Sequence, residues 1–380
     1  MNKPKVLFFV DRMRVGGIQT LLVHLFEQPE FSAIQPELLL LDDGQEYDLK
    51  QKVEQMGIPV HQLKGIWVKS PKDYLAYCKA MKNFFAAHHD YQAVHMNSGP
   101  KNFFVLYYAK QYGIPVRIAH SHNTGYQTSS KAQIWLGECF KLPLRRYASH
   151  YLACSDLAGA WMFGKKNQKS GRVQVIPNGI ELEKYQFNQQ IRDEVRSEWD
   201  VQQGTLVIGN VGRFTKQKNH GFLLEIFAEL CKIKPNSKLV LSGIGEEMER
   251  AKSKAQELEI QDKVLFLGFR QDVPRIVQGM DVFLMPSLYE GFPVTAVEAQ
   301  ASGLPCVFTD TITREAAILP NVGYLSLSQS PCEWAQACTE LAHSVNRQEC
   351  TQQLEQAGYS IHEMARCLIQ LYITGKGTKA

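Results

Sequence analysis

The chain has 380 residues, of which 44% are hydrophobic and 21% charged, with a formal net charge of +4. This length predicts two domains, and the composition excludes a disordered or fibrous protein. No apolar run reaches the length of a membrane span, and no signal peptide precedes the first predicted strand. Nine cysteines are scattered singly, which favours a reducing cytoplasmic location and argues against a structural zinc site.

The charge is distributed unevenly between the two halves of the chain. Residues 1–180 carry a net charge of +9, whereas residues 181–380 carry −5. A basic first half predicts an anionic partner: a phosphorylated substrate, a membrane surface or nucleic acid. Because the sequence holds no recognisable nucleic-acid-binding motif, nucleic acid ranks last among these partners.

In the first half, short apolar runs alternate with helical patterns. A Gly-Gly turn follows the first run, and an amphipathic helix is predicted from about Gln19. The alternation predicts a parallel sheet wrapped by helices. The runs expected to form strands are residues 6–10, 37–41, 93–96 and 116–119.

The same pattern restarts in the second half. Pro177-Asn178-Gly179 and the polar residues after it mark a linker, and the helical pattern of the tail either packs locally or crosses back to the first domain. We expect two doubly wound domains that face each other across a cleft, with the active site between them. The expected strands are residues 206–211, 238–242, 264–267, 282–285 and 305–308, and the expected helices residues 222–234, 246–258 and 359–372.

Two carboxylates follow the strand expected at residues 282–285. Glu290 lies in the loop after this strand, and Glu298 lies about two turns into the helix that begins after Pro293. Since α/β proteins bind ligands at the carboxyl ends of their strands, both can face one polyhydroxylated ligand, with free amides between them for its phosphates. Two glutamates at this spacing are also common as ordinary loop and helix acids, so the pair alone leaves both interpretations open.

Cations and glycines follow two other strands of the second half. Gly212 and Arg213 stand at a strand end, with Lys218 shortly after. Arg213 and Lys218 suit a diphosphate, the first through a forked contact and the second as a point charge; the alternative is a solvated basic loop. Gly243, after the next strand, either lets a nucleotide lie close to the backbone or forms a plain turn.

The first half carries two further motifs at strand ends. Gly16 and Gly17 suit the close approach of an anion or a simple tight turn, and they lack the full Gly-x-Gly-x-x-Gly pattern of a nicotinamide site. His120 and His122 are expected in the turn after residues 116–119, where they are candidates for polar contact or proton chemistry. Without a third ligand nearby they do not form a credible zinc site.

Residues 133–151 combine aromatic, apolar and basic side chains. This composition is typical of a helix that lies on an anionic membrane. It is equally typical of an amphipathic helix whose apolar face is part of the core, and the sequence does not distinguish the two.

Taken in order along the whole chain, these motifs resemble those of the retaining glycosyltransferases of family 4, which have the GT-B architecture. Among them, His120–Asn123 resembles the loop of bacterial exopolysaccharide and capsule members of the family. The resemblance rests on Ile176–Ile180, Gly212-Arg213 with Lys218, the Glu290/Glu298 pair, Ala301–Pro305 and His120–Asn123.

The resemblance implies roles for these residues. Glu290 would hold hydroxyls of the donor sugar, and Glu298 the ribose of the nucleotide. Arg213 and Lys218 would bind the diphosphate and offset the charge of the leaving group without a metal. His120 would lie near the anomeric carbon or the sugar hydroxyls, which completes a catalytic set of His120, Glu290, Arg213 and Lys218. The other implied donor-site residues are Gly16, Gly17, Gly212, Gly243, Gly291, Phe292, Pro293, Val294 and Thr295, with Phe269 and Arg270 beside the base.

The implied activity is retaining, metal-independent transfer of a hexose from a nucleotide sugar, most simply a UDP-sugar, to a lipid-linked or polysaccharide acceptor in cell-surface polysaccharide synthesis. No cofactor is implied. Residues 1–180, with a C-terminal helix at about 359–380, would form the acceptor-side domain, and residues 181–358 the nucleotide-sugar domain. The basic first half extends the prediction to peripheral association with the inner face of the membrane.

Two alternative functions stay open. One is a nucleotide-sugar epimerase of the same architecture, and the other is a non-catalytic partner of another transferase. The sequence also departs from the family at Gln19, Thr295 and Gln300, which leaves the acceptor contacts and the fine choice of donor undecided.

Overall fold

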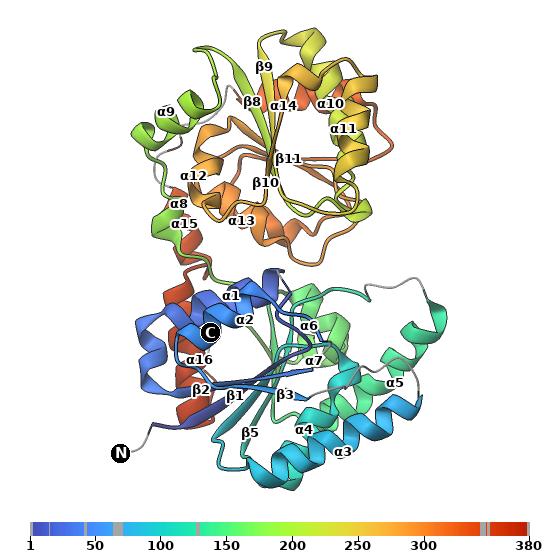
Figure 1. The fold of residues 1–380 in the computed structure, drawn as a ribbon, viewed down its shortest axis with the longest axis vertical. Coiled ribbons are helices and arrows are strands. Elements are labelled where there is room, and N and C mark those ends of the chain that lie inside the picture. The colour runs from blue at the N-terminus through green and yellow to red at the C-terminus, as the bar shows by residue number, and fades with distance from the viewer. Residues whose placement is uncertain are drawn as a thin grey trace. The chain divides into compact units, whose positions relative to one another are not determined.

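The computed structural model describes residues 3–14, 16–41, 44–63, 71–126, 130–342, 347 and 350–377. The chain divides into two compact units (Figure 1). The first unit comprises Met1–Ile180 and Ser360–Ala380, and the second comprises Glu181–Tyr359. Each unit is built on one parallel β-sheet with helices packed against it.

The sheet of the first unit has seven strands in the order β3-β2-β1-β4-β5-β6-β7. The central strands are apolar and buried almost throughout, as expected for a parallel sheet covered on both faces. The strands are β1 (Lys5–Val10), β2 (Gln35–Leu41), β3 (Val60–Leu63), β4 (Ala93–Met96), β5 (Val116–Ser121), β6 (His150–Ala153) and β7 (Val173–Val175).

Helices from both ends of the chain cover one face of this sheet. Phe8 of β1 lies in one apolar core with Leu22 of α1, Val53 of α2 and Leu368 of α16. In Figure 1, α16 accordingly lies in the first unit, although it is the last helix of the chain. The helices of this unit are α1 (Gly17–Glu27), α2 (Asp48–Gln55), α3 (Pro71–Ala87), α4 (Phe104–Gln111), α5 (Lys131–Tyr147), α6 (Asp156–Phe163), α7 (Lys165–Lys169) and α16 (Ile361–Thr374).

The return of the chain into the first unit depends on one close backbone approach. The amide of Ile361 donates to the carbonyl of Ile180 at 3.0 Å, and Ile180 forms a parallel bridge with Ser360. A Cβ atom on Gly179 would lie 2.6 Å from Cα of Ile361. The glycine of the Pro-Asn-Gly segment is therefore required where the outgoing and returning chains touch.

The sheet of the second unit has six strands in the order β10-β9-β8-β11-β12-β13. Its strands are β8 (Leu206–Val211), β9 (Ser237–Ser242), β10 (Val264–Gly268), β11 (Val282–Met285), β12 (Cys306–Thr309) and β13 (Val322–Leu325). Its helices are α8 (Leu182–Tyr185), α9 (Gln189–Glu198), α10 (His220–Ile233), α11 (Met248–Glu257), α12 (Val273–Ile276), α13 (Val294–Ala301), α14 (Pro331–Ala342) and α15 (Cys350–Gln356).

Both strand orders reverse direction once, between β1 and β4 in the first sheet and between β8 and β11 in the second. On either side of such a point the connecting helices leave toward opposite faces of the sheet. This opens a crevice at the carboxyl ends of the two strands, where doubly wound proteins bind their ligands. Candidate ligand-binding residues are therefore those that follow β1 and β4 in the first unit and β8 and β11 in the second.

The structure corrects several sequence-based boundaries. Four strands were not expected, because β3, β7 and β13 are sheet edges with no continuous buried run and β6 is buried over only half its length. Strand β7 ends two residues before the Pro177-Asn178-Gly179 turn that marks the linker. Strand β5 continues to Ser121, so His120 belongs to the strand and not to the turn after it, and α1 begins at Gly17 rather than Gln19.

None of the helices in the described ranges is both long and apolar enough to cross a bilayer.

We predict that Leu368→Ala lowers the free energy of unfolding by about 2–5 kcal/mol, because Leu368 is fully buried in the core that α16 shares with β1 and α1. Chemical denaturation monitored by circular dichroism would measure the loss. The matched control is Gln370→Ala on the exposed face of the same helix, which should change stability by less than about 0.5 kcal/mol. Equal losses in the two variants would contradict the packing described for α16.

Candidate active site

The reversal point of the second sheet brings together two motifs that are about 70 residues apart in the sequence. Nζ of Lys218, after β8, lies 2.7 Å from Oε1 of Glu290, after β11. Gln217 donates to the other carboxylate oxygen at 3.1 Å. Only 16% of the Lys218 side chain and 7% of the Glu290 side chain are exposed, so each charge depends on the other for much of its solvation.

The loop between β8 and α10 is fixed to the loop after β11 by polar side chains that the sequence analysis missed. Asn210 donates to the carbonyl of Leu284 at 2.7 Å, and Asn219 to that of Pro286 at 3.1 Å. The carbonyl of Gln217 accepts from the amide of Leu288 at 2.8 Å. Asparagines at the end of a buried strand and before a helix are the signal that would have identified these contacts.

The loops after β8 and β9 pack backbone against backbone, and this packing requires glycine. Gly243 and Gly245 have φ angles of +148° and +159°. A Cβ atom would lie 1.9 Å from the carbonyl oxygen of Gly212 at position 243, and 2.2 Å from that of Phe214 at position 245. Contact between the loops is therefore sufficient to require glycine at position 243, whether or not a nucleotide binds there. The same contact holds the segment that carries Arg213, whose side chain is exposed.

Other predicted donor-site residues of the second unit have partners of their own. Arg270 forms a forked ion pair with Asp272 at 2.7 and 2.6 Å, beside the exposed Phe269. The ring of Phe292 stacks on that of Tyr359, with centroids 5.9 Å apart. The described contacts therefore bring Lys218 and Glu290 together, but they do not bring Arg270 to that pair.

Glu298 lies in α13, the helix that begins directly after Pro293. Burial raises the pKa of its carboxyl to about 6, and a hydrogen bond with Tyr185 opposes that rise. The amides of Val294 and Thr295 are in the first turn of α13, where backbone donors have no intrahelical acceptor. Glu298 is therefore a carboxyl group that changes charge near neutral pH. The amides of Val294 and Thr295 are hydrogen-bond donors suited to an anion.

Gln300, a departure from the family pattern, has a structural explanation. Its amide donates to the carbonyls of Ala296 and Ala316 at 2.8 and 2.7 Å. Its oxygen accepts from the amides of Ile318 and Leu319 at 2.9 and 3.0 Å. This fully buried side chain fixes the segment after β12 to α13.

The carboxyl edge of the first sheet carries three neighbouring histidines. His120 of β5 lies between His95 of β4 and His122, with ring centroids 5.2 Å and 4.0 Å away. His122 is in turn hydrogen-bonded to the amide groups of Asn97 and Asn178, at 2.9 and 3.1 Å. Burial lowers the pKa of His95 to about 3, that of His122 to about 4 and that of His120 well below its ordinary value, so all three are neutral near pH 7.

A second polar cluster at this edge also escaped the sequence analysis. Asp11, directly after β1, accepts hydrogen bonds from Ser98 and, at 2.6 Å, from Asn102, and it forms an ion pair with Lys101 at 3.1 Å. Its partners follow β4, so the cluster spans the reversal point of the first sheet. A polar residue directly after each of two buried strands is the signal that would have revealed it.

The Gly-Gly turn lies beside this cluster in the sequence and opens α1. Gly16 is extended, and a Cβ atom on Gly17 would meet nothing within 4 Å. The side chain of Gln19 donates to the carbonyl of Arg12 at 3.0 Å and closes the loop after β1, which explains this departure from the family pattern. Gly17 therefore leaves open space at the start of an 11-residue helix.

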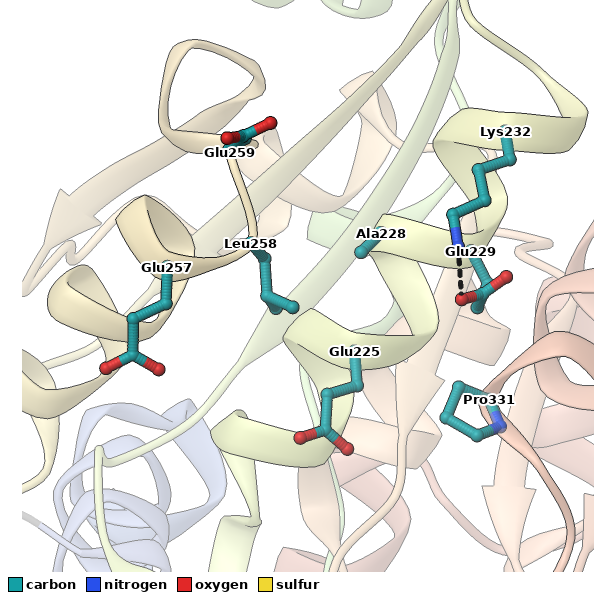
Figure 2. A pocket seen from close by; sticks show the side chains of 8 residues that line it. All are labelled: Glu225, Ala228, Glu229, Lys232, Glu257, Leu258, Glu259 and Pro331. Carbon is teal, nitrogen blue, oxygen red and sulfur yellow. Dashed lines mark hydrogen bonds and ion pairs between the residues drawn. The ribbon is translucent and has the colours of Figure 1, made fainter.

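A separate pocket lies between α10 and α11 of the second unit, and Figure 2 shows the acidic side chains that line it. Two of these acids form close ion pairs with lysines: Glu229 pairs with Lys232 at 2.7 Å, and Glu225 with Lys254 at 3.1 Å. None of the residues expected to bind the donor lines this pocket. Within the described ranges, no three His, Cys, Asp or Glu side chains are grouped as metal ligands would be.

Comparison with known proteins identifies the family. Residues 15–184 match the model described as Glycosyltransferase Family 4, and residues 191–359 match the one described as Glycosyl transferases group 1. The putative glycosyltransferase EpsF of Bacillus subtilis is 33% identical over 379 residues, which cover 98% of this chain and 97% of that protein. The chain belongs to glycosyltransferase family 4 and is a glycosyltransferase.

More distant relatives share the architecture. The UDP-Gal:alpha-D-GlcNAc-diphosphoundecaprenol alpha-1,3-galactosyltransferase of Escherichia coli is 25% identical over 301 residues, covering 78% of this chain and 76% of that one. The structure of Anabaena Alr3699/HepE in complex with UDP and glucose aligns with a TM-score of 0.78 at 19% identity, over 98% of this chain and 100% of that one. The fold is therefore GT-B.

The buried histidines predict that acid destabilises the first unit. Below pH 6.5 the unfolded chain binds protons at these histidines, whereas in the folded chain their lowered pKa values keep them neutral. The stability that the neutral histidines contribute is therefore complete above pH 6.5 and is lost as the pH falls. Between pH 7 and pH 5, His95 and His122 should each remove about 2 kcal/mol of stability. In the second unit Glu298 acts in the opposite direction, by about 1 kcal/mol, because its pKa is raised in the folded state.

Denaturation curves at pH 7 and pH 5 for two variants would isolate this effect. His95→Gln should lose about 2 kcal/mol less than the parent chain between the two pH values, whereas His89→Gln, at an exposed position, should match the parent. The same pH dependence in both variants would contradict the buried, neutral state of His95.

Proposed function

We propose that this glycosyltransferase moves a hexose from a UDP-sugar to a lipid-linked or polysaccharide acceptor in cell-surface polysaccharide synthesis, with retention of anomeric configuration. The observation that carries the proposal is the Lys218–Glu290 pair at the reversal point of the second sheet. Relatives that support it are EpsF, the Escherichia coli galactosyltransferase named above and the Salmonella typhi Vi polysaccharide biosynthesis protein VipC/TviE.

The contact distance fits the covalent structure of a nucleotide sugar. The anomeric carbon is bonded to a phosphate oxygen, so the group that binds sugar hydroxyls must neighbour the group that binds phosphate. Glu290 and Lys218 meet this condition at 2.7 Å. On donor binding, the diphosphate would take Lys218 together with Arg213, and the sugar hydroxyls would donate to Glu290, so that both charges keep a partner.

The remaining donor contacts follow from the same placement. The amides of Val294 and Thr295 would bind a phosphate oxygen at the start of α13, and Glu298 would accept from the ribose hydroxyls beside Tyr185. Phe269 would pack against the base beside the Arg270–Asp272 pair. UDP is proposed as the nucleotide because HepE was crystallised with UDP and UDP-glucose and the Escherichia coli relative is named for UDP-galactose.

The chemistry proceeds without an enzymic nucleophile in this proposal. The bond from the anomeric carbon to the phosphate oxygen breaks while the acceptor oxygen attacks the same face, and the acceptor proton passes to the departing phosphate. Arg213 and Lys218 stabilise the negative charge that develops on the diphosphate, so no metal ion is needed. In this proposal His120 would contact an oxygen of the sugar, and Gly17 would leave space for the approach of the substrate.

The acceptor is assigned to the first unit. Asp11, Ser98 and Asn102 form a preorganised polar cluster suited to sugar hydroxyls, and the adjacent, partly exposed Lys101 suits the diphosphate of a lipid-linked acceptor. The Escherichia coli relative, named for a diphosphoundecaprenol acceptor, supports an acceptor of this chemistry.

A donor screen tests the function and the role of Glu290 together. UDP at 100 times its dissociation constant should stabilise the chain by about 2.7 kcal/mol in a thermal-shift assay. Glu290→Gln should retain binding of UDP but lose the added stabilisation given by the correct UDP-sugar, and its transfer rate should fall about 10²- to 10³-fold. The matched control is Glu229→Gln, which breaks a Glu–Lys pair of the same length in the acidic pocket and should leave transfer unchanged.

The screen also separates the alternatives. Stabilisation by GDP-mannose but not by UDP-sugars would overturn the choice of nucleotide, and full activity of Glu290→Gln would overturn its role. An isomeric nucleotide sugar formed from the donor alone would identify an epimerase. Nucleotide binding without turnover across donor and acceptor panels would identify a non-catalytic partner.

We further propose that α5 docks on the anionic cytoplasmic face of a membrane. The proposal is supported by apolar side chains of α5 that are exposed, whereas Phe140 and Leu144 of the same helix pack within the first unit. Trp135 and Leu142 are 69% and 71% exposed and lie two helical turns apart on one face. Arg146, one further turn along, is exposed on the same stripe and suits acidic headgroups.

Vesicle co-sedimentation tests this docking. Trp135→Ser combined with Leu142→Ser should reduce binding to vesicles that contain phosphatidylglycerol by at least about tenfold, because each change removes buried apolar area. Leu157→Ser, at an exposed position of α6, is the control and should bind as the parent does. Binding to neutral phosphatidylcholine vesicles with equal strength would contradict the electrostatic part of the proposal.

A further inference from the structure

Three polar side chains lie inside the apolar core of the first unit. They are Tyr372 in the last turn of α16, His95 in β4 and His120 in β5, and each is at most 1% exposed. The ring of Phe8 packs against two of them, with centroids 5.6 Å from His95 and 5.7 Å from Tyr372. Buried polar groups in such surroundings need hydrogen-bond partners, so their arrangement requires an explanation.

The three side chains form one linear hydrogen-bonded chain. The hydroxyl of Tyr372 lies 2.6 Å from Nδ1 of His95, and Nε2 of His95 lies 3.0 Å from Nδ1 of His120. The chain ends at Nε2 of His120, which is buried and has no hydrogen-bond partner within the described structure. One nitrogen at the end of an otherwise satisfied chain is thus left for a ligand.

The positions of the protons follow from the first member of the chain. Burial raises the pKa of Tyr372, so its hydroxyl carries a proton, and Nδ1 of His95 is the acceptor in reach. If that hydroxyl did not donate, its proton would be left unsatisfied in the core at a cost in free energy.

A neutral His95 that accepts at Nδ1 must carry its proton on Nε2, and it donates that proton to Nδ1 of His120. His120, neutral as well, then carries its own proton on Nε2. The alternative order, with every proton reversed, leaves the tyrosine hydroxyl proton without an acceptor.

We propose that Tyr372 and His95 are positioning residues that hold His120 as the Nε2–H tautomer, so that it presents one N–H donor to an oxygen of the bound sugar substrate. The nature of that ligand rests on the proposed function, whereas the tautomer does not. Because Nε2 of His120 is buried, the substrate oxygen reaches it after neighbouring side chains move. The last turn of α16, 277 residues from His95, therefore controls a group that contacts substrate.

Nitrogen-15 NMR of the full chain with labelled histidine tests the tautomer directly. The His120 signals, assigned by their loss in His120→Gln, should show a protonated Nε2 and an unprotonated Nδ1. Tyr372→Phe removes the hydroxyl that donates to Nδ1 of His95, so a second tautomer of His120 should appear. The kcat/KM for transfer should fall about 3- to 10-fold, the range expected for one hydrogen bond.

The matched control is Tyr77→Phe, which removes a buried hydroxyl of the same unit that has no hydrogen-bond partner in the described structure. It should leave both the tautomer and the transfer rate unchanged. A protonated Nδ1 on His120 in the parent chain, or the parent tautomer in Tyr372→Phe, would overturn the proposed chain of protons.

Two substitutions at His120 test whether its Nε2–H group donates the hydrogen bond to substrate. His120→Gln places an amide N–H near the position of Nε2 and should retain more activity than His120→Asn, whose shorter amide reaches only the position of Nδ1. Equal loss in the two variants, with the parent tautomer as proposed, would overturn the role of Nε2–H. Because the NMR measurement needs no substrate, failure of the proposed transfer reaction would not be mistaken for failure of the tautomer assignment.

Discussion

The reversal of strand order within each parallel sheet is the constraint on which the site depends. A helix that connects two parallel strands covers the face toward which it runs, so the strand ends stay uncovered only where the connections diverge. In the second sheet this point lies between β8 and β11, and in the first between β1 and β4. Asp11, Asn97 and Gly212 directly follow β1, β4 and β8, and Asn219 donates a hydrogen bond to the carbonyl of Pro286, which directly follows β11.

At the reversal point of the second sheet, Lys218 and Glu290 form an ion pair that holds two opposite charges largely out of water. Either charge alone would be strongly destabilising in such a position, and together they form a neutral, hydrogen-bonded unit with Gln217. In the proposed function, the donor substitutes for each partner, with phosphate at the lysine and hydroxyls at the glutamate. The site therefore does not have to create its charges when the donor arrives.

The first unit shows how a remote segment is tied to a site. Helix α16 completes the core around Phe8, and its return requires glycine at position 179 because the two backbones touch there. The same helix carries Tyr372, which joins that core to the histidines at the carboxyl edge of the sheet. The apolar core and the hydrogen-bonded histidines of the first unit thus both depend on α16.

The sequence by itself determined the buried strands, the two-unit organisation, the order of the motifs and the family, because apolar period and motif order are local properties of the chain. It also placed Glu290, Arg213 and Lys218 at strand ends. It missed β3, β6, β7 and β13, which are short and only partly buried, and it placed His120 in a turn rather than in β5. Only the tertiary structure decided that Lys218 faces Glu290, that Gly243 is required by Gly212, that Gln300 fills a buried polar gap and that Tyr372 reaches His95. These contacts join residues up to 277 positions apart, and no local pattern records them, because they depend on which strands become neighbours and on the direction in which each side chain leaves its sheet or helix.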